Sequence, residues 1–85
     1  MASKRDIKKD LNYMVFDIWD ECFFLMDINP DKTGAAEQLI EDAADFQDSM
    51  LEKINTAKNK VDFRVIRDSI EKGAEEFVKK LNALA

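Results

Sequence analysis

The stretch that decides the fold is residues 14–26, MVFDIWDECFFLM. Ten of its thirteen residues are apolar, and they include three Phe and the only Trp of the chain. Four of the apolar residues recur at steps of three and four, as on one face of an α-helix: Met14, Ile18, Cys22 and Leu25. The run also carries three acids and is too short to cross a bilayer. It therefore predicts an amphipathic helix with one face in a protein core.

Working outward, the same periodicity reaches back through Val15 and Leu11 to Ile7, so the first helix is expected at about residues 4–27. Asn29-Pro30 ends it, because a residue before proline avoids the helical region. A second apolar stripe runs from Ala36 to Ala57 and a third from Phe63 to Leu84. These stripes predict further helices at about residues 34–55 and 60–84.

Three residues are expected to cap these helices with a side-chain oxygen. Ser3 with Asp6, and Asn59 with Asp62, have the spacing of a capping box. Thr33 is the expected cap of the second helix. The two connections, near residues 28–33 and 55–59, are short enough to make successive helices antiparallel neighbours. We therefore expect an all-α fold, an up-down-up antiparallel three-helix bundle, with residues 1–85 as a single domain.

The composition agrees with a small folded domain outside the membrane. The chain has 85 residues, 46% of them hydrophobic and 36% charged, with a formal net charge of −5. A single cysteine excludes an internal disulfide and suits a reducing cytoplasm. Residues 1–11, MASKRDIKKDL, return to charge before the apolar segment of a secretory signal can begin. We expect a cytoplasmic protein.

The residue types argue against an enzyme. His is absent, which removes the commonest general base and the commonest metal ligand near neutral pH. Cys22 falls on the apolar stripe and is expected to be a buried small hydrophobe rather than a reactive thiol. Four acids recur within the second helix at steps of four, three and four, and they are expected on its solvated face: Glu41, Asp45, Asp48 and Glu52. No catalytic residue, cofactor or metal is expected.

Gly73 lies inside the third expected helix, where a glycine is less favourable than alanine by about 1 kcal/mol. Two explanations are open: the close approach of a neighbouring helix, or a functional kink.

Charge is distributed unevenly along the expected bundle. Residues 1–10 and 49–69 meet at one end and carry nine basic and five acidic side chains, whereas the remaining residues carry four basic and thirteen acidic ones. We call six of these cations the basic pole: Lys4, Arg5, Lys8, Lys9, Arg64 and Arg67. Solubility and ion pairing within the bundle explain the pole, with a polyanion site as the alternative. Nucleic acid is not the expected partner, because the pI near 4.6 is opposite to that of a nucleic-acid binder.

The first helix carries more apolar surface than one core face needs. Beside its main stripe runs a second set, which we call the aromatic flank: Phe16, Trp19, Phe23 and Met26. Together the two stripes span about 200° at 100° per residue, and Tyr13 and Phe24 lie beyond that arc. The flank either completes the core or is partly buried against a second copy. Three aromatic side chains give on the order of 600 Å² per protomer, so a symmetric pair would reach the lower end of specific interfaces.

The opening SKRDIKKDLNY, residues 3–13, resembles the start of small, functionally uncharacterised bacterial helical proteins. The resemblance implies a bacterial cytoplasmic origin and carries over no functional residue. The sequence as a whole predicts a non-catalytic structural or interaction protein that self-associates, as a homodimer, through the aromatic flank. An adaptor that binds a polyanion through the basic pole is the alternative, and a different, unidentified protein partner is also open.

Overall fold

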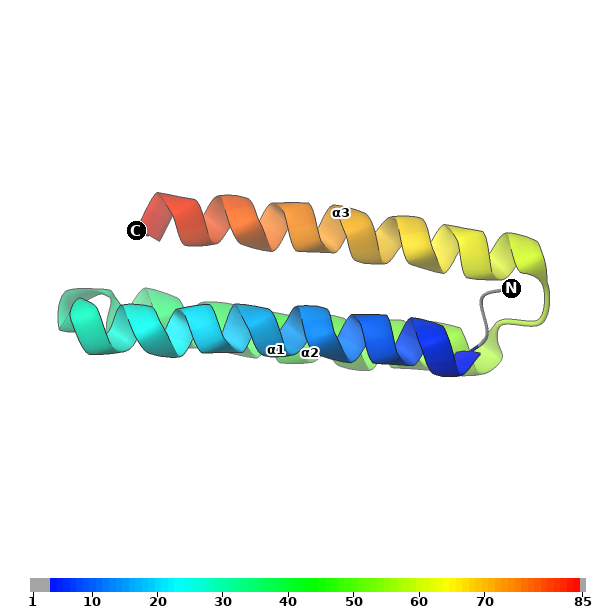
Figure 1. Cartoon of the computed structure of the whole chain (residues 1–85), viewed down its shortest axis with the longest axis horizontal. Coiled ribbons are helices and arrows are strands. Elements are labelled where there is room, and N and C mark those ends of the chain that lie inside the picture. Colours follow the sequence, from blue (N-terminus) through cyan, green and yellow to red (C-terminus); the bar gives the residue numbers. More distant parts are fainter. Residues whose placement is uncertain (1–3, 85) are drawn as a thin grey trace.

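The computed structural model describes residues 4–84 and is an all-α three-helix bundle (Figure 1). Helix α1 spans Lys4–Ile28, α2 spans Thr33–Thr56 and α3 spans Lys60–Leu84. A single 3₁₀ turn, η1 (Pro30–Lys32), joins α1 to α2. These α-helix ends lie within one residue of the expected ones. The helices run up-down-up in a rod of 45 × 17 × 17 Å.

The helix termini correct one of the expected caps. Thr33 is wrong as a cap, because η1 leads directly into α2 and makes Thr33 its first residue; the Thr33 hydroxyl donates to the Pro30 carbonyl oxygen at 2.8 Å. Asn59 is confirmed, since its Oδ1 accepts the Asp62 N–H at 3.0 Å. Asp62 Oδ2 in turn accepts from the Lys58 N–H rather than from the cap residue. The expected Ser3 cap lies outside the described residues.

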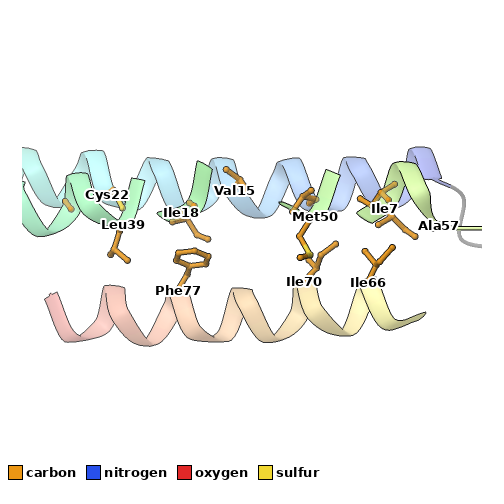
Figure 2. Packing of buried hydrophobic residues seen from close by; sticks show 14 residues of the cluster. Ile7, Val15, Ile18, Cys22, Leu39, Met50, Ala57, Ile66, Ile70 and Phe77 are labelled. Carbon is orange, nitrogen blue, oxygen red and sulfur yellow. The ribbon is translucent and has the colours of Figure 1, made fainter. Parts of the chain in front are cut away.

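The core is formed by the three predicted apolar stripes. Its fully buried centre is Leu11, Val15, Cys22, Ala36, Ala43 and Ile54. Helix α1 buries six residues, α2 buries five and α3 buries three. Figure 2 shows the three α3 residues, Ile66, Ile70 and Phe77, pointing toward the other two helices. The helices α1 and α2 are the most closely associated pair, and α3 packs against both of them.

None of the helices described over residues 4–84 is both long enough and apolar enough to cross a membrane.

Candidate functional site

The candidate site is the side of α1 that faces away from the core. Because α1 touches α2 and α3 through its buried stripe and the flanks of that stripe, its opposite side is left to solvent. We call the exposed residues within about 60° of the direction opposite the buried stripe, at 100° per residue, the α1 outer face: Arg5, Asp6, Lys9, Tyr13, Phe16, Asp20, Phe23, Phe24 and Asp27.

Large aromatic side chains are unusually accessible on the α1 outer face. Phe16 and Phe23 are 49% and 52% exposed, and Tyr13 and Phe24 are 58% and 59% exposed. A typical monomer exposes few contiguous apolar patches of this kind, and such patches mark interaction surfaces.

The structure divides the predicted aromatic flank into two pairs. Trp19 and Met26 are half-buried and pack against the core, whereas Phe16 and Phe23 remain exposed. Trp19 is also held by a hydrogen bond, since its indole N–H donates to the Ile40 carbonyl oxygen of α2 at 3.3 Å. The Phe16 ring leans on Trp19, with 5.7 Å between ring centroids and 49° between ring planes. Trp19 therefore lies between the core and Phe16, and it packs against the Phe16 ring rather than exposing most of its own ring.

Tyr13 and Phe24 belong to this surface although the sequence placed them outside the expected arc. The missed signal was the direction opposite the core stripe. At 100° per residue, that direction falls among Lys9, Phe16 and Asp20, and Tyr13 and Phe24 border it on one side. Trp19 and Met26 lie nearer to the core stripe than that direction, and both pack against the core.

Four cations of the basic pole gather beside the exposed aromatics. Lys4, Arg5, Lys8 and Lys9 line an open depression on α1 together with Asn12, Tyr13 and Phe16. The Lys9 ammonium lies 5.8 Å from the centroid of the Tyr13 ring, within the range of a cation–π contact. Lys4 Nζ donates to the Asn55 carbonyl oxygen at 3.2 Å, where the negative end of the α2 dipole favours a cation.

The other two cations of the basic pole are on α3 and do not line that depression. Arg67 forms an ion pair of 3.7 Å with Asp10 of α1, and both side chains are more than half exposed. Such a surface pair contributes at most about 1 kcal/mol. Arg64 is exposed in the first part of α3. The structure therefore separates the α1 cations from Arg67, which is engaged with an acid of its own bundle.

Two further predictions from the sequence concern the four acids of α2 and the thiol of Cys22. The four acids of α2 are exposed, and no group of three or more His, Cys, Asp or Glu in this part of the chain is placed to hold a metal ion. Cys22 is fully buried, as expected. Burial, reinforced by the neighbouring Glu21 carboxylate, raises the pKa of the Cys22 thiol above its ordinary value of 9.0, so the thiol stays protonated at neutral pH.

No protein-family model, curated protein or solved structure matches this chain. The resemblance of residues 3–13 to bacterial helical proteins stays a prediction.

Proposed function

We propose that this protein is a non-catalytic interaction module that self-associates as a homodimer through the α1 outer face, in the cytoplasm. The observation that carries the proposal is the set of four exposed aromatic side chains on one face of α1. Aromatic residues are enriched in protein interfaces, and leaving such a surface in water invites aggregation. A second copy covers it in a closed pair, which is the commonest form of homo-oligomer.

The exposed area predicts a weak dimer. A fully buried aromatic side chain contributes 150–250 Å², so four that are about half exposed offer roughly 400 Å² per copy. With the aliphatic stems of Arg5 and Lys9 added, the total for two copies is about 1,000 Å², which is the size of transient interfaces. This is less than the sequence suggested, because Trp19 and Met26 already pack against the core. We expect a dissociation constant in the micromolar range, about 1–100 µM.

Phe16→Glu tests this proposal. Because Phe16 is half exposed, a carboxylate there is tolerated by the monomer but is desolvated in the interface. We expect wild-type protein to sediment as a dimer at high concentration and Phe16→Glu to sediment as a monomer with unchanged helicity. Val65→Glu is the matched control, since Val65 is 58% exposed on α3 and lies outside the α1 outer face; it should leave the dimer intact.

Two outcomes would contradict the proposal. A wild type that stays monomeric at hundreds of micromolar removes the dimer altogether. Loss of helicity in Phe16→Glu, with Val65→Glu unaffected, would mean that Phe16 belongs to the core of the monomer.

One observation favours a second candidate function, a polyanion-binding adaptor. Tyr13 and Phe16 lie beside the α1 cations in one depression, and single-stranded nucleic acid is bound by cations and aromatic rings together. The net charge of −5 and the Arg67–Asp10 ion pair favour the dimer instead.

A further inference from the structure

The charges of α1 change sign halfway along the helix. Residues 4–15 carry four cations and two acids, and residues 16–28 carry four acids and no cation. On the α1 outer face the half before Phe16 carries two cations, Arg5 and Lys9, and one acid at its edge, Asp6, whereas the half after Phe16 carries two acids, Asp20 and Asp27. Arg5, Lys9, Asp20 and Asp27 are exposed, and neither of the ion pairs found over residues 4–84 involves any of these four residues.

Resting on the proposed function, we infer that the two α1 helices of the dimer run antiparallel, with the cationic half of each against the acidic half of the other. A parallel pair would set Arg5 and Lys9 against their own copies, and Asp20 and Asp27 against theirs. Like charges facing each other suppress an association, and complementary ones direct it. The partner is therefore a second copy of this chain in one defined orientation.

The length of α1 also sets a register. Full overlap of two antiparallel Lys4–Ile28 helices places the twofold axis at Phe16, the midpoint of the helix. Each Arg5 then lies opposite Asp27 of the other copy, and each Lys9 lies opposite Phe23. Lys9 is already positioned over a ring in the monomer, at 5.8 Å from the centroid of Tyr13, so its ammonium can contact an aromatic face in the dimer. The two Phe16 rings meet at the axis.

The charge of the whole rod favours the same orientation. The end formed by residues 4–10 and 49–69 has an excess of basic side chains, and the rest of the chain has a large excess of acidic ones. Antiparallel α1 helices place the basic end of each bundle beside the acidic part of its partner. A parallel arrangement would bring the two acidic parts together.

Charge reversal tests the orientation. The double variant Arg5→Glu/Lys9→Glu makes both halves of the α1 outer face acidic, and we expect its dimer to dissociate at least tenfold more readily than the wild type. The quadruple variant Arg5→Glu/Lys9→Glu/Asp20→Lys/Asp27→Lys exchanges the two halves, and we expect it to recover most of the lost affinity. Sedimentation equilibrium measures both, with circular dichroism to confirm folding. Lys79→Glu/Lys80→Glu, an equal change in charge at exposed sites near the end of α3, is the control and should have little effect.

A cross-linking measurement reads the orientation directly. In a Cys22→Ala background, a mixture of Arg5→Cys and Asp27→Cys chains should form a mixed disulfide faster than either variant forms one with itself. Rapid cross-linking of Arg5→Cys with itself would overturn the antiparallel inference. A wild-type dimer whose affinity is unchanged in the Arg5→Glu/Lys9→Glu variant would also overturn it, while leaving the proposed self-association standing. A monomeric wild type would instead remove the proposed function, and this inference with it.

Discussion

Gly73 shows how a single residue decides the approach of two helices. The ring of Phe46 from α2 lies directly against the Gly73 backbone; a β-carbon at position 73 would lie 2.6 Å from Phe46 Cε2 and 3.1 Å from Cε1. The Phe46 ring also packs edge-on against Phe77, at 5.7 Å between centroids and 76° between ring planes, so a shift of the ring would disturb that contact. Of the two explanations open from the sequence, contact with a neighbouring helix is supported, since the Phe46 side chain of α2 occupies the space beside Gly73; a functional kink stays untested.

We expect Gly73→Ala to destabilise the fold by about 1 kcal/mol. Overpacking in a core costs about 1–3 kcal/mol, and the better helix propensity of alanine offsets about 1 kcal/mol of that. In a Phe46→Ala background the clash disappears, so the same substitution should instead stabilise by about 1 kcal/mol relative to Phe46→Ala alone. Urea unfolding at one fixed protein concentration measures both differences, since dimerisation adds a concentration-dependent contribution.

Gly34 is the control for that measurement. A β-carbon added at Gly34 would meet no atom within 4 Å, so Gly34→Ala should stabilise by about 0.4–1 kcal/mol in either background. If Gly73→Ala stabilised the wild type as much as Gly34→Ala does, the contact between Gly73 and the Phe46 ring would not be tight.

Among the three helices, α3 has the least packing against the core. It buries three residues, against six in α1 and five in α2. An open depression also remains between α3 and α1, lined in part by Tyr13, Ala74 and Val78. The first turn of α3 is capped by Asn59, whereas its last turn contains no basic side chain that would interact favourably with the helix dipole.

We expect α3 to open locally before the rest of the bundle. Amide hydrogen exchange at the centre of α3 should then be at least tenfold faster than at the centres of α1 and α2, which corresponds to an opening free energy lower by about 1.4 kcal/mol. The measurement belongs in the monomeric Phe16→Glu variant, so that burial of α1 in a dimer does not exaggerate the difference. Equal protection at the centres of all three helices would mean that the bundle opens as one unit.

The sequence was sufficient for the elements and insufficient for the site, for physical reasons visible in particular residues. Helix positions followed from apolar spacing and from Asn29-Pro30, which act locally along the chain. The start of α2 was misjudged at Thr33 because a 3₁₀ turn continues into an α-helix without a break. Which aromatic side chains of α1 face solvent depends on the side of α1 against which α2 packs. The spacing of residues within α1 does not specify that side. Trp19 is the example, since its neighbour Ile40 is 21 residues away.

At the scale of the whole molecule, one patch of cations has two competing uses. Arg5 and Lys9 lie on the α1 outer face, where a second copy would bring acids, and they also line the depression in which a polyanion would bind. The two uses exclude each other at one surface. The overall charge of −5 opposes the approach of any polyanion, and the acids outside the basic end strengthen that repulsion.

We therefore expect no submicromolar complex with single-stranded DNA or RNA at about 0.15 M salt. Weak binding at low salt would not contradict this expectation. The affinity of such binding should fall with added salt, since each phosphate contact releases about 0.7–0.9 of a counterion. Fluorescence anisotropy of a labelled oligonucleotide across a salt series measures it, and Arg5→Glu/Lys9→Glu is the matched variant. A tight, salt-sensitive complex that is lost in that variant would establish the adaptor function instead. Because the same cations face the partner copy in the dimer, such a complex should also convert the wild-type dimer to monomers as oligonucleotide is added.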